Sequence, residues 1–266
     1  MKLTVLCDNN TFIDQYLLAE PALSFYIENE QDKILFDVGY SNVYKENATK
    51  LNIDLSNINK IVFSHGHDDH TRGIAYFDYE TRPQLYYCDG CFDKRRFNSI
   101  EVGFPYNISK IKKHFNLVKI DSPTEISPNL YFLGPIPRVN NFEKDNANFY
   151  IYKRDGWVED FCEDDSALVY VGKEGLSIIT GCSHSGICNI CEYAKKLFNK
   201  KIQLIIGGLH LFENNKKTQK SINYLKRNKI PVIYPCHCTS LCVKTEMLIN
   251  KLNVKEVASG LKLDIL

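Results

Sequence analysis

Ten consecutive residues constrain this chain more than any other feature, because they place four metal-ligand side chains within six positions. Residues 64–73 read SHGHDDHTRG, in which His65, His67, Asp69 and His70 form the pattern H-x-H-x-D-H. Packing alone does not call for four such side chains, and a solvated turn more often uses Asn, Ser, Lys or Glu. Neutral imidazoles and an ionised carboxylate are good ligands for Zn²⁺ and its neighbours. The pattern therefore predicts a divalent-metal site.

The residues on either side predict where this site sits in the fold. The apolar run at 58–63 is typical of a buried strand, and the Gly73-Ile74-Ala75 segment favours entry into a helix. We therefore expect a rigid strand to deliver the ligand-bearing turn.

Three later segments repeat one pattern, an apolar strand followed by a loop that contains a histidine. The strands expected at 176–180, 202–206 and 232–234 end just before His184, His210 and His237. Loops beyond strand ends commonly converge on one cleft. These residues and the three histidines of the motif account for six of the seven histidines, and we expect them to gather at a single site.

His210 has two interpretations. It follows Gly207-Gly208, a pair that lets the backbone pass close to another group, which can be a substrate. The imidazole can then serve as a general acid or as a hydrogen-bond donor to substrate. The alternative is a buried histidine bonded to a strand end.

Composition narrows the classes of partner. The chain has 266 residues with a formal net charge of +1, so nothing suggests an electrostatic grip on nucleic acid or an acidic membrane. The N-terminus lacks the pattern of a signal peptide, and no apolar run approaches the length of a membrane span. We expect a cytoplasmic protein that binds a small molecule. The oligomeric state is not indicated.

The remaining pattern is that of interspersed strands and helices without a linker, which predicts one domain over residues 1–266. Residues 84–150 form a less regular, elaborated region. Further strands are expected at 2–7, 23–28, 33–39, 129–133, 148–152 and 167–171, and helices at 42–51, 187–199 and 217–228, before a final helix and short strand.

Charged and cysteine-rich segments add weaker candidates. Arg72 and the run Lys94-Arg95-Arg96 can hold an anionic group such as a phosphate, although the run is more typical of a solvated surface. The pairs Cys88/Cys91 and Cys188/Cys191 can form part of a structural zinc site or simply pack in the core. The segment Cys236-x-Cys238-x-x-x-Cys242 offers three more thiols.

These motifs resemble the metallo-β-lactamase superfamily, which implies an α+β fold, a four-layer αββα sandwich with metals at one edge of the sheets. A subgroup resemblance runs nearly the full length. It is to proteins similar to 7,8-dihydropterin-6-yl-methyl-4-(β-D-ribofuranosyl)aminobenzene 5′-phosphate synthase, and it rests on residues 18–21, 64–71, 134–138, 180–187, 206–211 and 237–239. The subgroup usually has Gly at position 72 and a bulky residue at 68, so Asp68 and Arg72 add charge beside the metal loop.

The resemblance implies two divalent ions, with zinc the first choice and manganese or iron as alternatives. One ion would take His65, His67 and His184, and the other Asp69, His70 and His237. Cys182 stands where many members have a bridging Asp, so it is either a thiolate ligand or a small buried filler beside His184. Asp37 would orient a ligand histidine, or it is only a turn-forming residue before Gly39.

The leading functional hypothesis is a hydrolase that uses a metal-activated hydroxide on a small anionic metabolite, phosphorylated or ester-like. Asp69 would orient the nucleophile and move a proton, and Arg72 and His210 would contact substrate. The alternatives are an iron-dependent oxidoreductase of the same fold, a pterin-pathway synthase as the subgroup's name implies, and a sensing protein that keeps its metals without turnover.

Overall fold

Two large β-sheets stack face to face in the computed structural model, which describes residues 1–78, 81–144 and 148–266. The strands of the first sheet are β1 (Lys2–Cys7), β2 (Ser24–Asn29), β3 (Asp32–Phe36), β4 (Lys60–Val62), β5 (Gln84–Tyr87), β8 (Asn116–Lys119) and β17 (Lys262–Asp264). They run in the order β17-β1-β2-β3-β4-β5-β8. The pairs from β3 to β8 are parallel and the others are antiparallel.

The second sheet has six strands in the order β16-β15-β14-β13-β10-β9. Their bounds are β9 (Thr124–Ser127), β10 (Leu130–Phe132), β13 (Ala167–Val171), β14 (Leu176–Thr180), β15 (Ile202–Gly208) and β16 (Val232–Cys236). The pairs β14-β15 and β15-β16 are parallel, so these three strands end at the same edge.

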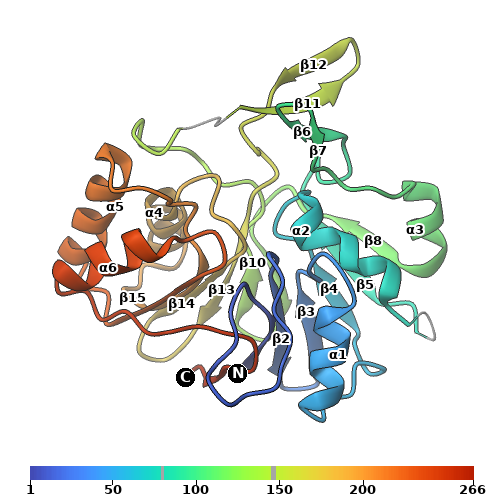
Figure 1. The fold of residues 1–266 in the computed structure, drawn as a ribbon, viewed down its shortest axis with the longest axis horizontal. Coiled ribbons are helices and arrows are strands. Elements are labelled where there is room, and N and C mark those ends of the chain that lie inside the picture. The colour runs from blue at the N-terminus through green and yellow to red at the C-terminus, as the bar shows by residue number, and fades with distance from the viewer. Residues whose placement is uncertain (79–80, 145–147) are drawn as a thin grey trace.

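Helices cover the outer face of each sheet, as Figure 1 shows. On the first sheet lie α1 (Val43–Lys50), α2 (Asp68–Thr71), the 3₁₀ helix η1 (Arg72–Tyr76) and α3 (Ile108–His114). On the second lie α4 (Ile187–Phe198), α5 (Lys216–Arg227) and α6 (Leu241–Ile249). The order of layers is therefore helix, sheet, sheet, helix, and the predicted αββα sandwich is confirmed.

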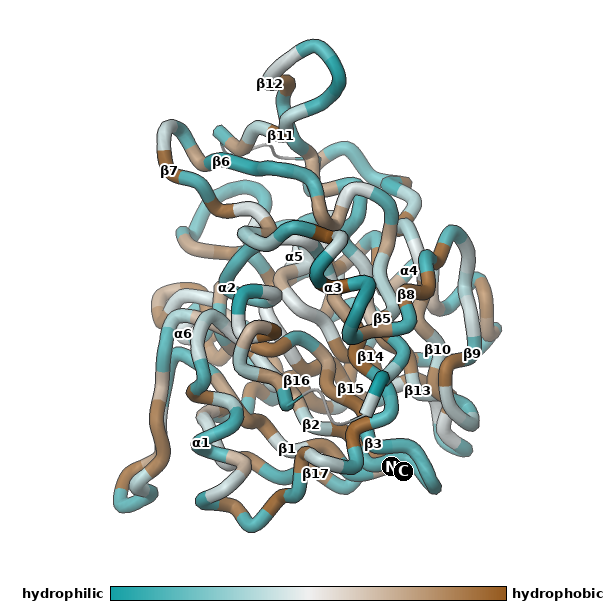
Figure 2. The backbone as a smooth tube through the Cα atoms, turned by 90° about the vertical axis from the view of Figure 1, so that its right-hand side faces the viewer, coloured by the Kyte–Doolittle hydropathy of each residue, from teal (hydrophilic) through white to brown (hydrophobic). Residues whose placement is uncertain are grey.

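Side-chain alternation along the strands explains the layers. Ile34 and Phe36 of β3 point into the core between the sheets, whereas Leu35 points outward to the helices. In β14, Ile179 faces the core between the sheets and Ile178 faces α4 and α5. Because successive strand residues alternate in direction, near-continuous apolar strands supply all three apolar layers. In Figure 2 the hydrophobic stretches accordingly gather on the strands of both sheets.

The strands and helices expected from the sequence are confirmed, with small shifts at their ends. The region at about 84–150 is more regular than expected, and within it residues 145–147 lie outside the described residues. It contributes β5, β8, β9, β10, α3 and part of a third sheet, ordered β12-β11-β6-β7. The strands of that sheet are β6 (Arg95–Phe97), β7 (Ile100–Glu101), β11 (Phe149–Lys153) and β12 (Gly156–Glu159), and it projects from the sandwich at the top of Figure 1.

The two termini lie side by side, because β1 pairs with β17 and the Met1 amine donates to the Ile265 carbonyl at 3.0 Å. No helix in the described part of the chain combines the length and apolar character that crossing a membrane requires.

Candidate metal centre

Parallel strands deliver the histidine loops to one edge of the sandwich. The H-x-H-x-D-H motif follows β4, and its second half lies on the single-turn helix α2. Cys182 and His184 follow β14, His210 follows β15, and His237 follows β16. The structure therefore brings the six predicted histidines together, while His114 lies on α3 and is exposed.

Three of these histidines form a first set of ligand atoms. His65 Nε2 lies 3.0 Å from His67 Nδ1, and the His184 ring centroid lies 4.7 Å from each of the other two rings. All three side chains are buried. His184 Nε2 is buried without a hydrogen-bond partner in the described part of the structure. An unpaired buried ring nitrogen is costly, so this nitrogen is suited to bind a metal ion.

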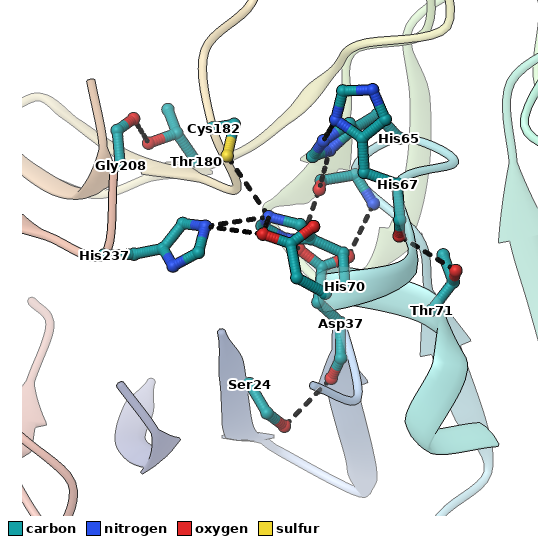
Figure 3. Close-up of polar contacts among 12 residues, drawn as sticks. Ser24, Asp37, His65, His67, His70, Thr71, Thr180, Cys182, Gly208 and His237 are labelled. Atoms are coloured by element: carbon teal, nitrogen blue, oxygen red, sulfur yellow. Dashed lines mark hydrogen bonds and ion pairs between the residues drawn. The ribbon is translucent and has the colours of Figure 1, made fainter. Parts of the chain in front are cut away.

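A second set is formed by Asp69, His70 and His237. His70 Nε2 lies 3.1 Å from His237 Nε2, and an Asp69 carboxylate oxygen lies 3.2 Å from His237 Nε2 and 3.7 Å from His70 Nε2. Figure 3 shows His237 and Cys182 approaching His70 from two different loops.

Cys182 lies between the two sets. Its Sγ is 3.2 Å from His70 Nε2. Its Sγ also lies within 4.8 Å of the ligand atoms of His65 and His184, and within the same distance of those of His70 and His237. Cys182 is only 4% exposed, which fits both a metal-binding thiolate and a small buried filler. Its distance to both sets favours the thiolate, because a ligand must lie close to the ion that it binds.

Hydrogen bonds from outside the cluster orient the imidazoles. The carboxylate of Asp37 accepts from the Ser64 backbone N–H at 2.8 Å, the Ser64 hydroxyl at 2.7 Å and His70 Nδ1 at 2.7 Å. Since the Ser64 hydroxyl donates to Asp37, its oxygen is left to accept from His65 Nδ1 at 2.9 Å. His237 Nδ1 donates to Asn9 Oδ1 at 3.0 Å. Each bond places the ring proton on Nδ1 and leaves Nε2 free to face the centre.

The electrostatics favour a bound cation. Burial lowers the pKa values of His65, His67 and His184 well below the usual value, so these rings are neutral and able to act as ligands. At His70 burial acts in the same direction, but Asp69 and Asp37 outweigh it and raise the pKa to about 9. Burial opposes ionisation of Asp69, yet the charges of His70 and His237 hold its pKa well below the usual range. The negative field that attracts a proton here also attracts a metal ion.

The spacing of the nitrogens fits a metal ion. Two nitrogens bound at about 2.0–2.1 Å to one tetrahedral ion lie about 3.3 Å apart. The separations within the two sets are 3.0 and 3.1 Å. Imidazole, carboxylate and thiolate together suit zinc and its softer neighbours. The residues present therefore fit divalent-metal binding.

A cavity of about 710 Å³ opens over these ligands. Apolar and aromatic side chains form much of its wall, namely Pro21, Tyr40, Phe97, Val102, Phe149 and Phe212. The Phe149 ring stacks on His67 with centroids 4.8 Å apart. Asp68 also lines the cavity, and burial together with the neighbouring Asp69 raises its pKa to about 6. No lysine or arginine occurs among the described residues that line it.

The basic residues proposed to contact substrate lie elsewhere. Arg72 does not line this cavity but stacks on the ring of Tyr40, 4.4 Å from its centroid, and donates to the Tyr40 hydroxyl. Arg95 corrects the expectation of a solvated basic run. It is 2% exposed, with Nε 2.7 Å from Asp160 and Nη2 2.6 Å from Asp164. Two carboxylates explain how a guanidinium can be buried.

The sequence did not indicate the role of residues 160–164, which contact the H-x-H-x-D-H loop at Gly66 and His67. Asp164 accepts both from Arg95 and from the Gly66 backbone N–H, at 2.8 Å. Cys162 Sγ lies 3.8 Å from His67 Nε2, the ring nitrogen that faces away from His65. The only sequence signal is an acidic run, Glu159–Asp165, just before an apolar strand.

The cysteine pairs belong to the core. Cys188 and Cys191 pack in the layer between the second sheet and its helices. Cys88 and Cys91 are buried in the other two apolar clusters. Neither pair belongs to any group of potential metal ligands found among the described residues. The core interpretation of these pairs is therefore favoured over a structural zinc site.

His210 and Cys238 both line the cavity and are half-buried. The Gly-Gly pair before His210 approaches protein, not open space. A Cβ at Gly207 would lie 2.1 Å from the Thr180 carbonyl oxygen, and one at Gly208 would lie 2.5 Å from Cys238 Sγ. Burial raises the pKa of Cys182, whereas donation from Cys182 and His210 outweighs burial at Cys238 and lowers its pKa.

Comparisons with known proteins agree with this architecture. The family model described as the metallo-beta-lactamase superfamily matches residues 18–199. An uncharacterized protein of Methanocaldococcus jannaschii is 30% identical over 91% of this chain and 92% of its own length. The 7,8-dihydropterin-6-methyl-4-(beta-D-ribofuranosyl)-aminobenzene-5′-phosphate synthase of the same organism is 27% identical over 90% of this chain and 87% of its own. A crystal structure of a metal-dependent hydrolase of the beta-lactamase superfamily superimposes with a TM-score of 0.87 at 28% identity, covering 100% of this chain and 99% of that one.

Proposed function

The chain belongs to the metallo-β-lactamase superfamily, and on that premise we propose that it is a metal-dependent hydrolase of a small molecule that binds in the cavity over His67 and Asp69. The observation that carries the proposal is the convergence of two sets of ligand atoms on the floor of one cavity, with Cys182 within reach of both.

In this proposal His65, His67 and His184 hold one divalent ion, and Asp69, His70 and His237 hold a second, with Cys182 able to contact both. Zinc is the first choice, with manganese or iron as alternatives. When bound, such ions lower the pKa of water toward neutrality and polarise the bond to be cleaved.

The protein's own residues would orient and protect the reaction. Asp69 is 30% exposed, so its carboxylate can reach both His237 and a water molecule on the cavity side. It would orient that water and accept its proton. Asp37 and Ser64 keep the protons of His70 and His65 on Nδ1. His210 lies at the cavity wall, where it can donate to a substrate or a leaving group.

The residues in the cavity wall indicate which class of substrate it would bind. The metal ions would bind a phosphorylated or ester-like group of the substrate, because the described residues that line the cavity include no lysine or arginine. Phe97, Phe149 and Phe212 would contact the rest of the molecule. A pterin-pathway reaction is the second candidate, favoured by the same aromatic walls and by the name of the 27% identical relative.

Hydrolysis of chromogenic substrates tests the proposal. Zinc-loaded protein should cleave bis(p-nitrophenyl) phosphate or p-nitrophenyl acetate, and Asp69→Ala should lower kcat by at least about 100-fold, as expected for loss of a proton-transfer group. His114→Gln removes an exposed imidazole on α3 and is the matched control. Full activity of Asp69→Ala would contradict the assignment. A single iron with oxygen uptake in protein purified without added metal would favour the oxidoreductase instead.

A further inference from the structure

A third group of potential ligands lies beside the two sets already described. It consists of Cys182, His210 and Cys238, whose Sγ atoms and one ring nitrogen all lie within 4.8 Å of one another. The three residues come from the loops after β14, β15 and β16, so three neighbouring parallel strands deliver them. Neither His210 nor Cys238 belongs to the first two sets.

Local contacts hold Cys238 in place. The backbone N–H of His210 donates to Cys238 Sγ at 3.3 Å, and Cys238 Sγ lies 3.5 Å from the Cys182 carbonyl oxygen. Gly208 makes this approach possible, because any Cβ there would collide with the sulfur. The loop after β15 is therefore shaped around the thiol of Cys238.

His210 is held at a cost. Its backbone has φ = +49°, a left-handed conformation that is uncommon for residues other than glycine. Its Nδ1 is buried without a hydrogen-bond partner in the described part of the structure. Strain and an unpaired buried nitrogen commonly persist where function requires them.

From these observations we propose that Cys182, His210 and Cys238 form an additional site for a thiophilic cation such as Zn²⁺, Cd²⁺ or Cu⁺. Two thiolates and an imidazole form a soft ligand set, unlike the imidazole and carboxylate ligands of the two conventional sets. On binding, each cysteine loses its S–H proton to solvent as its sulfur–metal bond forms. The site shares Cys182 with the proposed pair of ions, and it would use His210 as a ligand in place of the substrate donor named above, so it rests on the proposed function only at these two residues.

Metal counting and cobalt spectroscopy test this site without an activity assay. The apoprotein, kept reduced with a phosphine, is titrated with Zn²⁺ or Co²⁺. Cys238→Ser should bind one zinc ion fewer per chain than the wild type. The thiolate-to-cobalt charge-transfer absorption should fall by the share that this ion contributes, because its loss removes both of its sulfur–metal bonds. Cys242→Ser removes an exposed thiol on α6 and should match the wild type in both measurements.

A second variant covers the case in which Cys238→Ser misfolds. Asn tolerates the left-handed conformation, so His210→Asn keeps the backbone while removing the imidazole. This variant should lower the affinity for the additional ion at least about tenfold. That is the low end of the loss of metal affinity expected when a metal site is disturbed. Circular dichroism verifies the fold of both variants.

Asp69→Ala separates this site from the proposed hydrolase. That variant should lose activity and keep the charge-transfer absorption that depends on Cys238. An equal zinc count in the wild type and Cys238→Ser, or a charge-transfer band that Cys238→Ser leaves unchanged, would overturn the proposal even if hydrolysis were demonstrated.

Discussion

At the scale of single residues, Asp37 links several parts of the metal centre through hydrogen bonds. Its carboxylate bonds the backbone and side chain of Ser64 and the ring of His70, and through Ser64 it also reaches His65. It adopts φ = +58°, a conformation that Asp and Asn tolerate better than most residues. The left-handed backbone and the hydrogen bonds of the carboxylate are thus two separate features of Asp37, and its role in orienting a metal-binding histidine stays a prediction.

Asp37→Asn separates these two features. Asn preserves the left-handed backbone but replaces one acceptor oxygen with an NH₂ donor. If that donor faces His70, the ring proton must move from Nδ1 to Nε2, which removes the lone pair that a metal needs. We expect metal affinity to fall by about 10–100-fold, the range for loss of such a partner, in a competition titration with a chromophoric chelator.

Asp32→Asn is the matched control, because Asp32 pairs with Lys60 away from the centre. Unchanged metal affinity in Asp37→Asn would leave the residue with its turn-forming role alone.

The ligands could be predicted from sequence because their spacing is local or follows strand ends. Arg95 could not, because its burial depends on partners far along the chain. Asp160 and Asp164 lie 65 and 69 residues after it, and no periodic pattern links them to it. Without those partners a Lys-Arg-Arg run is best interpreted as a solvated surface.

At the scale of elements, strands with a clear apolar pattern were predicted, and the short, largely polar or exposed strands β6 and β7 were missed. β13 and β14 are five-residue apolar runs separated by a tight turn, so the pattern and the boundaries agree. β6 and β7 have three and two residues and are largely polar or exposed. β6 forms because it pairs with β11, and β7 because it pairs with β6, and the β6–β11 pairing joins segments about 50 residues apart in the sequence.

This third sheet contributes to the site through β11. Phe149 stacks on His67 at the cavity, while Tyr152 on the same strand is exposed and contacts Trp157. Phe149→Ala should raise KM for an aryl phosphodiester about tenfold with little change in kcat. An aromatic contact of ~1.4 kcal/mol corresponds to that factor.

Tyr152→Ala serves as the control on the same strand and should leave KM unchanged. Steady-state kinetics with aryl and alkyl substrates provide the measurement. An equal effect of Phe149→Ala on both substrates would mean that the ring shapes the centre and does not contact the substrate.

At the scale of the whole molecule, the sandwich concentrates its polar chemistry at one edge. Three apolar layers stabilise the fold, and the six clustered histidines lie with Asp69, Cys182 and Cys238 where the parallel strands end. The net charge of +1 and the cavity without described basic residues indicate that substrate capture does not depend on a broad electrostatic field. Bound cations are then the main positive charges in the cavity, so the metals should influence stability as well as activity.

Removing the metals should therefore lower the melting temperature. A ligand that binds only the folded chain stabilises it by about 4 kcal/mol at 1,000 times its Kd. For a chain of this size, that corresponds to a fall in Tm of about 10 °C on chelation. Calorimetry of zinc-loaded and chelator-treated protein measures the shift, and metal analysis verifies the removal. His67→Ala, which lacks one ligand, should show a smaller shift, because it gains less from the metal. If the metal-free and loaded proteins melted together, the ligand sets would contribute nothing to the stability of the folded state, and a pair of tightly bound ions would be contradicted.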